Sequence, residues 1–342
     1  MSGGVDSSVA GALLLDAGHD VVGVTMKLWG GDSDTGCCSV SDVDDARRVA
    51  QQLDIDHLVF NFGDDFDRHV VAPYVRDHAA GVTPNPCIEC NRHVKFDRLL
   101  RRADQLGFDA VATGHHARVA RTPAGRLVLE RGADPAKDQS YVVHMLDQAA
   151  LARTLFPVGS IDKAEVRRIA AERGLRTASK PDSQDVCFIT SQGGRETFLG
   201  DRITTRPARV VDTDGRDVGE VPAVELVTIG QRRGVGLPGG GPKRYVVDLD
   251  VAAGTVVVGS EDELLNDGLC ATDPTWTDGP VAGDVLVQVS AHGASLPAHV
   301  RLDAGRIVVD WATPQRKVAP GQSVVLYDLD DRRVLGGATA AR

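Results

Sequence analysis

In the first half of the sequence, short apolar runs of strand length alternate with amphipathic segments of helix length. Residues 41–53 illustrate the helical type, because they begin with Ser and Asp, which cap a helix, and their apolar residues are spaced so as to lie on one helix face. The predicted elements of this half are helices at 7–16, 41–53, 91–106 and 162–174, and strands at 20–26, 57–62 and 110–114. Such alternation is typical of βαβ units, so we predict an α/β fold with a parallel sheet covered by helices on both faces.

The pattern changes near residue 200, after which short β-type runs are separated by turn signals. The predicted strands of this half lie at 210–212, 218–221, 245–249, 255–258, 285–289, 299–302, 307–311, 323–327 and 334–335. Asp214-Gly215 is a hairpin-turn pair, and we expect a loop at 264–268. The runs predict β-rich units, the last of them a small antiparallel barrel or sandwich. The length of 342 residues agrees with two or three domains of about 150 residues each.

The composition excludes several classes of protein. Apolar residues make up 42% and charged residues 25%, which rules out a disordered or collagen-like chain. No stretch approaches the length of a transmembrane helix, and no basic segment precedes the apolar run at 9–15. We therefore expect a cytoplasmic protein without a membrane partner. In such a chain, six cysteines indicate metal or catalytic thiols rather than a disulfide framework.

The net charge of −10 favours a small-molecule enzyme over a nucleic-acid partner, but the charges are unevenly distributed. Residues 32–67 contain ten Asp and two Arg. Residues 92–131 contain nine Arg and Lys against four acids, a surplus of +5 that is mostly arginine. This surplus is suited to a polyanion, because arginine binds phosphate through two donors. The alternative is a solvated helix face followed by a basic loop.

The segment Ser2–Ser8 (SGGVDSS) runs directly into the first predicted helix. Its glycines let backbone N–H groups turn toward a ligand, its serines add hydroxyls, and the helix start adds a positive dipole end. These properties predict a phosphate-binding loop. It is not a Walker loop, because no Gly-Lys-Ser or Gly-Lys-Thr follows. A helix cap after a tight turn is the alternative.

Three cysteines have the setting of reactive thiols. Cys87 and Cys90 form a C-x-x-C at the entry to the basic helix, where the helix start, Arg92 and Lys95 favour a thiolate. Cys187 follows 97 residues after Cys90. A zinc knuckle or three inert buried thiols remain alternatives, although no second C-x-x-C supplies further zinc ligands at short spacing.

Eight segments in order resemble one known family. They are SGGVDSS (2–8), Met26-Lys27, TPNPCIECN (83–91), ATGH (112–115), KDQSY (137–141), LFPVG (155–159), DSQDVCFI (182–189) and IGQRRG (229–234). Together they resemble the tRNA-specific 2-thiouridylases, members of the PP-loop ATP pyrophosphatase superfamily. The resemblance implies a PP-loop domain of the adenine nucleotide alpha hydrolase-like fold at 1–200, a small β-rich domain at 201–268 and a C-terminal antiparallel β-barrel at 269–342.

The resemblance also implies ATP as a substrate, with Mg²⁺ as counter-charge. The positions that match nucleotide-binding residues are Ser2, Gly3, Gly4, Asp6, Ser7, Met26 and Gly114. His115 matches a supporting residue beside the reacting centre. In the superfamily a buried strand leads into the phosphate loop, whereas only Met1 precedes Ser2 here, so a strand of about five or six residues is expected ahead of the loop.

In this family the C2 oxygen of the wobble uridine of a tRNA is adenylated and then displaced by a persulfide sulfur. Cys187 matches the cysteine that carries the persulfide, and Cys90 matches the second catalytic cysteine, which pairs with it in a transient disulfide. A protein that donates persulfide sulfur is therefore an expected partner besides tRNA. The positions that match contacts to the target base or the tRNA are Asn85, Pro86, Cys87, Lys137, Asp138, Gln139 and Gln322.

Two questions stay open at this level. Some relatives carry Asp where this chain has Cys87, so Cys87, Cys90 and Cys187 form a three-thiol set that suits a [4Fe–4S] cluster with one open iron. We keep this cluster as a hypothesis. The alternatives for the function are another PP-loop ligase or amidotransferase, and a catalytically inactive RNA-binding relative.

Overall fold

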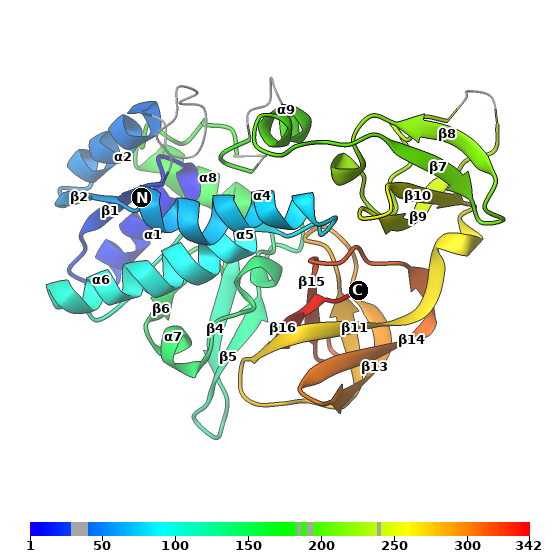
Figure 1. Ribbon diagram of the computed structural model, residues 1–342. Helices are drawn as coiled ribbons and strands as arrows, with labels where there is room; N and C mark the ends of the chain where they lie inside the picture. Colours follow the sequence, from blue (N-terminus) through cyan, green and yellow to red (C-terminus); the bar gives the residue numbers. More distant parts are fainter. Residues whose placement is uncertain (29–39, 183–185, 190–193, 238–240) are drawn as a thin grey trace.

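The computed structural model describes residues 1–28, 40–182, 186–189, 194–237 and 241–342. Figure 1 shows three regions: an N-terminal α/β region on the left, a small β-sheet unit at the upper right and a β-barrel at the lower right. The long helical segments of residues 63–106, in cyan, cross the molecule in front of the N-terminal strands and reach toward the barrel (Figure 1).

The N-terminal region confirms the predicted α/β class with parallel strand pairing. β1 (Gly23–Lys27) pairs with β2 (His57–Asn61), and β3 (Val111–Ala112) pairs with β6 (Thr154–Leu155), both in parallel. Three helices pack together beside these strands: α1 (Val5–Asp16), α2 (Val40–Gln52) and α8 (Lys163–Glu172). Val9, Val49 and Val166 belong to their shared apolar cluster, which follows from the helical spacing of apolar residues.

The helix predicted at 91–106 begins earlier and contains a π-helical part. The helical run consists of α5 (Pro86–Glu89), the π-helical η2 (Cys90–Arg98) and α6 (Leu99–Leu106), and ends at Gly107 with φ +78°. Asn85 fixes its start, because the Asn85 side chain accepts hydrogen bonds from the Cys87 and Ile88 amides at 3.1 and 3.4 Å. A second helical run precedes it: α3 (Gly63–Phe66), η1 (Asp67–Val71) and α4 (Ala72–Ala79).

The basic segment that follows β3 is a β-hairpin, where the sequence suggested a basic loop. β4 (Ala117–Arg121) and β5 (Leu127–Arg131) pair antiparallel, and β5 also pairs with β16 of the C-terminal barrel. Leu129 is buried against the cluster that also contains Tyr327 of the barrel. This pairing could not be read locally, because the partner strand lies about 200 residues away. The 3₁₀ helix η3 (Ser140–Val143) and α7 (Gln148–Ala152) follow the hairpin.

The central β-rich unit is a four-stranded sheet, as the resemblance implied. After α9 (Gly194–Gly200), the strands are β7 (Ala208–Asp212), β8 (Asp217–Val221), β9 (Tyr245–Asp250) and β10 (Thr255–Gly259), in the order β8-β7-β10-β9. β7 and β8 form the hairpin predicted around Asp214-Gly215, and β7 pairs with β10 in parallel. Short 3₁₀ turns η4 (Val224–Leu226) and η5 (Asp262–Leu264) complete the unit.

The C-terminal strands close into the predicted antiparallel barrel. They are β11 (Leu265–Trp276), β12 (Gly283–Gln288), β13 (Leu296–Asp303), β14 (Arg306–Arg316), β15 (Ser323–Tyr327) and β16 (Arg333–Ala340). The order β11-β14-β13-β12-β15-β16 is closed by pairing of β11 with β16. The loop expected at 264–268 is wrong, because β11 already begins at Leu265, opposite Arg316 of the long strand β14.

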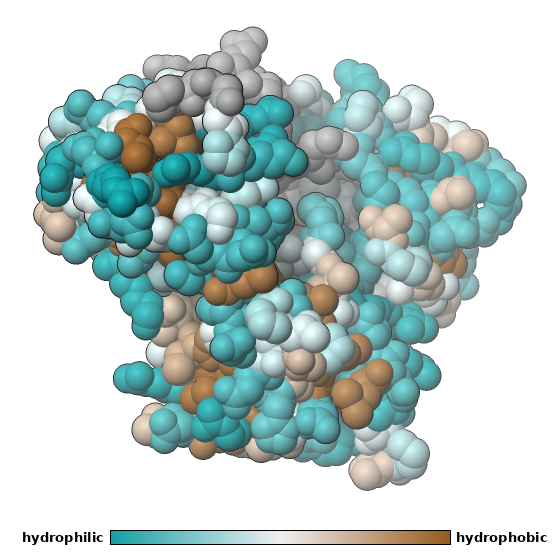
Figure 2. Space-filling model, turned by 90° about the vertical axis from the view of Figure 1, so that its right-hand side faces the viewer, coloured by the Kyte–Doolittle hydropathy of each residue, from teal (hydrophilic) through white to brown (hydrophobic). Residues whose placement is uncertain are grey.

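The surface turned to the viewer in Figure 2 is mainly hydrophilic, with hydrophobic residues in small separate groups. Among the helices that the structure describes, none combines the length and the apolar character needed to cross a membrane.

Candidate nucleotide and thiol site

The loop at residues 2–4 is shaped by its glycines. Gly3 has φ +70°, and a Cβ at this position would lie 2.5 Å from the carbonyl oxygen of Asp42 in α2. Gly4 is the N-cap of α1 and has no side chain with which to cap the first-turn amides. The Ser2 amide donates to Ser7 Oγ at 3.1 Å, which holds the two hydroxyls at the helix start. A twelve-residue helix that begins in this way is suited to bind an anion.

Gly114 lies against the start of α1, beside the loop. A Cβ on Gly114 would lie 2.7 Å from the Ser7 nitrogen and 2.9 Å from Asp6 Cβ. The sequence predicted Gly114 and the loop residues to share one nucleotide site, and the fold brings them together although they are more than 100 residues apart. Met1 lies beside β1, where its carbonyl accepts a hydrogen bond from Thr25 Oγ1 at 2.7 Å.

Asp6 forms an ion pair that the sequence did not predict. Lys163 Nζ lies 2.6 and 2.7 Å from the two carboxylate oxygens of Asp6, and His116 Nε2 lies 3.2 Å from Oδ1. Burial alone would raise the pKa of Asp6, but the hydrogen bonds from His116 and Lys163 outweigh it and lower the pKa below its ordinary value. Asp6 is therefore a carboxylate at neutral pH.

His115 is buried beside this pair and remains neutral. Burial, followed by the charges of Lys95 and His116, lowers the pKa of His115 well below its ordinary value. Its Nδ1 lies 2.7 Å from Thr113 Oγ1, and its ring packs against Phe96 and Phe156. A neutral imidazole in this position can support a reacting centre by hydrogen bonding, but it carries no charge there.

The residues 137–139, predicted to contact tRNA, bond mainly to the chain itself. Lys137 Nζ pairs with Asp182 at 2.9 Å. Asp138 accepts hydrogen bonds from Gly132, Arg131 and Ser140, the strongest at 2.7 Å. Gln139 Oε1 accepts a hydrogen bond from the His116 amide at 2.9 Å. In this arrangement the segment connects the surroundings of Asp6 to the hairpin β4–β5. The Lys137 side chain is 41% exposed and can also be reached from outside.

The predicted base-contacting stretch Asn85–Cys87 stands at the start of α5. Pro86 is buried and Cys87 is exposed in the first turn. The barrel holds Thr83, just ahead of this stretch, by two hydrogen bonds. The Thr83 amide donates to Pro320 O at 2.8 Å, and Gln322 Nε2 donates to Thr83 O at 2.5 Å. Gln322 and Asn85, which the sequence placed in one tRNA-binding set, are therefore close to the same turn.

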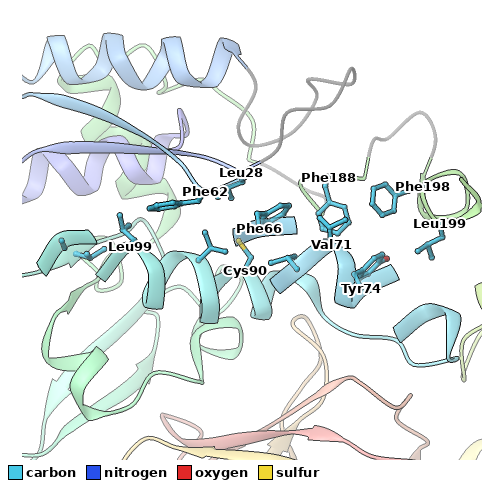
Figure 3. Packing of buried hydrophobic residues seen from close by; sticks show 14 residues of the cluster. Leu28, Phe62, Phe66, Val71, Tyr74, Cys90, Leu99, Phe188, Phe198 and Leu199 are labelled. Carbon is cyan, nitrogen blue, oxygen red and sulfur yellow. The ribbon is translucent and has the colours of Figure 1, made fainter. Parts of the chain in front are cut away.

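Cys90 belongs to one apolar cluster, against which Cys187 also packs, with residues from α3, η1, α4, η2, α6, β3 and α9. Cys90 is buried in the cluster, and Figure 3 shows its side chain near Phe66. Cys187 is half-buried and packs against the same cluster. Phe188 anchors the Cys187 segment, because its ring packs 5.7 Å from Phe66 and 5.4 Å from Tyr74.

The basic surplus of residues 92–131 is largely neutralised by acids elsewhere in the fold. Arg98 pairs with Asp65 at 2.9 Å, and Arg126 pairs with Asp278 at 2.5 Å. Arg131 is 18% exposed and pairs with Asp138 and Asp331. The excess of positive charge in residues 92–131 therefore does not form an open row of cations, because many of these arginines connect segments of the protein.

Three family descriptions match the chain in succession. Residues 1–191 match the tRNA methyl transferase HUP domain, residues 196–260 the tRNA methyl transferase PRC-barrel domain, and residues 266–340 the aminomethyltransferase beta-barrel domain. The whole chain is 47% identical to a tRNA-specific 2-thiouridylase MnmA of Chloroflexus aggregans, covering 97% of that relative. The chain belongs to the tRNA-specific 2-thiouridylase family.

The likeness extends to 2-thiouridylases of other bacteria. The chain is 46% identical to the protein of the same name from Roseiflexus sp. strain RS-1, of which it covers 98%. It is 47% identical to the one from Beutenbergia cavernae, of which it covers 93%. Among solved structures, the U34-tRNA thiolase NcsA from Methanococcus maripaludis aligns with 54% of this chain and 58% of its own, at 17% identity and a TM-score of 0.36.

The three thiols of this 2-thiouridylase family member do not form a metal centre as arranged here. Among the residues that the structure describes, no group of three or more His, Cys, Asp or Glu side chains is placed to hold a metal ion. Cys87, Cys90 and Cys187 all lie within the described residues, with Cys87 exposed and Cys90 buried.

In this 2-thiouridylase family member, three residues of the site were not predicted from the sequence: His116, Lys163 and Asp182. All three belong to the charged network around Asp6. Two of them had a local signal: Asp182 opens the DSQDVCFI segment, and Lys163 follows Asp162, the N-cap of a predicted helix. Their connection to the nucleotide loop could not be predicted, because it depends on the packing of α8 against α1.

Proposed function

We propose that this chain catalyses the ATP-dependent 2-thiolation of the wobble uridine of tRNA, releasing AMP and pyrophosphate. The observation that carries the proposal is that strand β1 adjoins both the nucleotide loop and the apolar cluster that contains Cys90. Met26, near the carboxyl end of β1, packs against the cluster that holds Cys90 and Cys187. The loop at residues 2–4 lies beside the same strand, through the hydrogen bond of Met1 with Thr25.

The first step is adenylation of the uridine. The start of α1 is suited to the triphosphate, because Gly4 places no side chain over the first-turn amides and Ser2 and Ser7 present hydroxyls. Gly114 lets the chain after β3 pack directly against the start of α1. Mg²⁺ would supply counter-charge to the phosphates. The uridine O2 bonds to the α-phosphorus, pyrophosphate leaves, and the N3 proton is released, so that C2 now carries AMP as a good leaving group.

The second step uses both cysteines. A donor protein first loads Cys187 with a persulfide. The terminal sulfur then attacks C2, the C2–O bond breaks, and AMP leaves. The Cys90 thiolate attacks Cys187 Sγ, which releases the sulfur on the uridine and leaves a Cys90–Cys187 disulfide. A thiol reductant restores both thiols for the next cycle. The apolar cluster supports this step because Cys90 belongs to it and Cys187 packs against it.

The tRNA would bind over the start of α5. Asn85, Pro86 and Cys87 would contact the flipped-out base, and Gln322 would contact the tRNA from the barrel side. The exposed part of the Lys137 side chain would contact the tRNA, while Asp138 and Gln139 would hold the backbone of this segment in place. The [4Fe–4S] hypothesis has no arrangement of ligands behind it among the described residues and forms no part of the proposal.

The test is thiolation of an unmodified tRNA in vitro with a persulfide or sulfide donor, followed together with AMP release. We expect tRNA-dependent AMP release, and loss of 2-thiouridine in Cys187→Ser and in Cys90→Ser under persulfide conditions. Cys270→Ser is the matched control, because Cys270 is exposed on β11 in the barrel. Thiolation by Cys187→Ser at the rate of the unmodified chain would contradict the proposal. AMP release that needs no tRNA would favour another PP-loop ligase, and no AMP release would favour an inactive relative.

A further inference from the structure

Lys163 stands between two carboxylates that belong to different parts of the proposed site. Its Nζ lies 2.6 and 2.7 Å from the oxygens of Asp6 in the nucleotide loop. The same atom lies 2.9 Å from Asp182 Oδ1, five residues ahead of Cys187 in the sequence. The Lys163 side chain is 11% exposed, so water competes weakly for its three contacts.

Asp182 is held more firmly than an ordinary surface carboxylate. Besides Lys163, it pairs with Lys137 and Arg167, both at 2.9 Å. Burial would raise the pKa of Asp182, but the hydrogen bonds from Lys137 and Lys163 outweigh it and bring the pKa to about 2. Asp182 is therefore ionised at any pH at which the protein works, and three cations surround it.

Two described residues ahead of Cys187 contact the helices that adjoin the nucleotide loop. Thr177 Oγ1 donates to Ser8 Oγ at 3.0 Å, in the first turns of α1. Lys180 pairs with Asp42 at 2.6 Å, and Asp42 is the residue whose backbone lies against Gly3. Beyond Asp182, Phe188 is fixed in the apolar cluster. Contacts with α1 and α2 therefore precede Cys187 in the sequence, and a contact with the apolar cluster follows it.

We propose that Lys163 is a positioning residue that ties the nucleotide loop to the Cys187 segment, so that a single side chain sets both ATP binding and the placement of the persulfide cysteine. The role of Cys187 as the persulfide carrier comes from the proposed function, and this inference rests on it. Lys163 balances the charge of Asp6 beside the anionic phosphates. Through its ion pair with Asp182 it also holds the chain five residues ahead of Cys187. Neither effect requires Lys163 to touch a substrate.

The experiment measures the two effects separately and without tRNA. ATP affinity is measured by calorimetry with Mg²⁺ and a non-hydrolysable ATP analogue. Cys187 accessibility is measured as the alkylation rate by iodoacetamide, followed by mass spectrometry of the peptide that contains Cys187. The rate is taken at the plateau at high pH, where the thiol is fully ionised, so that a changed thiol pKa does not enter.

For Lys163→Met we expect both quantities to change. ATP binding weakens about tenfold, because Asp6 keeps an unbalanced charge beside the phosphates. Cys187 alkylation accelerates roughly five- to thirtyfold, because Asp182 loses one of the cations that hold it in place. Asp182→Asn separates the effects: alkylation accelerates, whereas ATP affinity stays within about twofold, since the contact between Lys163 and Asp6 is kept.

Arg168→Met is the matched control on the same helix. Arg168 is exposed and pairs only with Glu165 and Glu172 of α8 among the ion pairs of the described residues, so both quantities should stay within about twofold. A folded Lys163→Met protein that changes one quantity alone, or neither, overturns the proposal. If Lys163→Met does not fold, Asp182→Asn decides: an unchanged Cys187 alkylation rate overturns the proposal, and a faster rate at unchanged ATP affinity supports it.

Both measurements are independent of tRNA thiolation. If the chain fails to thiolate tRNA while Lys163→Met shows both effects, the proposed function fails, and Lys163 still couples ATP binding to the accessibility of Cys187 but no longer positions a persulfide carrier. If thiolation succeeds and the two effects are absent, only the positioning role fails.

Discussion

Around the nucleotide loop, the charge of each ionisable side chain is set by its immediate neighbours. The pKa values of Asp6 and Asp182 are lowered because hydrogen bonds outweigh the cost of burial, from His116 and Lys163 at Asp6 and from Lys137 and Lys163 at Asp182. The pKa of His115 is lowered because burial disfavours its cation and the nearby charges of Lys95 and His116 add to that effect. Near the loop, both carboxylates are thus ionised and paired with lysines, and the neighbouring histidine is neutral.

Buried histidines away from the loop make the stability of the protein sensitive to mild acid. Burial lowers the pKa of both His78 and His144 to about 4, from an ordinary value of 6.5. Between these values the unfolded chain binds more protons, so stability falls as the pH drops from 6.5 to 4 and is constant above 6.5 with respect to these groups. Each histidine contributes a loss of about 1.4 kcal/mol per pH unit in this window.

Urea unfolding at pH 7 and pH 5 checks this. The free energy of unfolding of His144→Gln should fall less steeply with decreasing pH than that of the unmodified chain. The difference should equal the contribution of one histidine. His19→Gln is the control, because His19 is exposed and its replacement should leave the slope unchanged. Equal slopes in all three proteins would show that burial of His144 does not set this dependence.

At the scale of elements, the hairpin β4–β5 joins the N-terminal region to the barrel. It extends the barrel sheet through the pairing of β5 with β16. Arg131, at the end of β5, pairs with Asp138 and Asp331 at 2.7 Å each, and its guanidinium lies 3.8 Å from the centre of the Tyr327 ring. One side chain therefore connects the hairpin, the segment before η3 and the barrel.

Arg131→Met should reduce the free energy of unfolding by about 3 kcal/mol, because it leaves the buried Asp138 without its cation. Arg126→Met is the control in the same hairpin. The pair of Arg126 with Asp278 is exposed on both sides, and its loss should cost less than about 1 kcal/mol. Urea unfolding followed by tryptophan fluorescence measures both variants, and equal losses would contradict the role assigned to Arg131.

At the scale of the whole molecule, the turn before α5 is where the regions of the protein meet. Thr83 is bonded to Pro320 and Gln322 of the barrel, and its hydroxyl lies 3.5 Å from Thr228 Oγ1 of the central unit. A Cβ on Gly321 would lie 2.5 Å from Val82 Cγ1, so the barrel backbone approaches this turn closely. The proposed base-contacting residues therefore depend on the assembly of the complete chain.

Gln322→Leu should raise the KM for tRNA roughly two- to tenfold, because the hydrogen bond that holds Thr83 is lost. The affinity for ATP should not change, since the nucleotide loop lies elsewhere. Gln315→Leu serves as control, because the Gln315 side chain bonds to Thr313 of its own strand. Steady-state thiolation kinetics measure the two KM values. A change in ATP affinity with an unchanged KM for tRNA would refute the assignment.

The sequence by itself determined the class of the fold and indicated the residue types on which the proposed chemistry depends. Alternating periodicity predicted parallel strands with helices and then a barrel, because burial of apolar side chains has a local signature in the spacing of residues. Glycine and serine ahead of a helix indicated an anion site for an equally local reason. The three reactive-thiol candidates were likewise visible as residue types in a favourable setting.

Only the tertiary structure decided how distant charges pair. The arginines of residues 92–131 looked available for a polyanion, yet Asp65, Asp278 and Asp331 neutralise several of them. The contact of Lys163 with both Asp6 and Asp182 likewise has no trace in the sequence. Ion pairs depend on a separation of a few ångströms in space, and residues far apart in the chain reach that distance only once the helices and strands have packed.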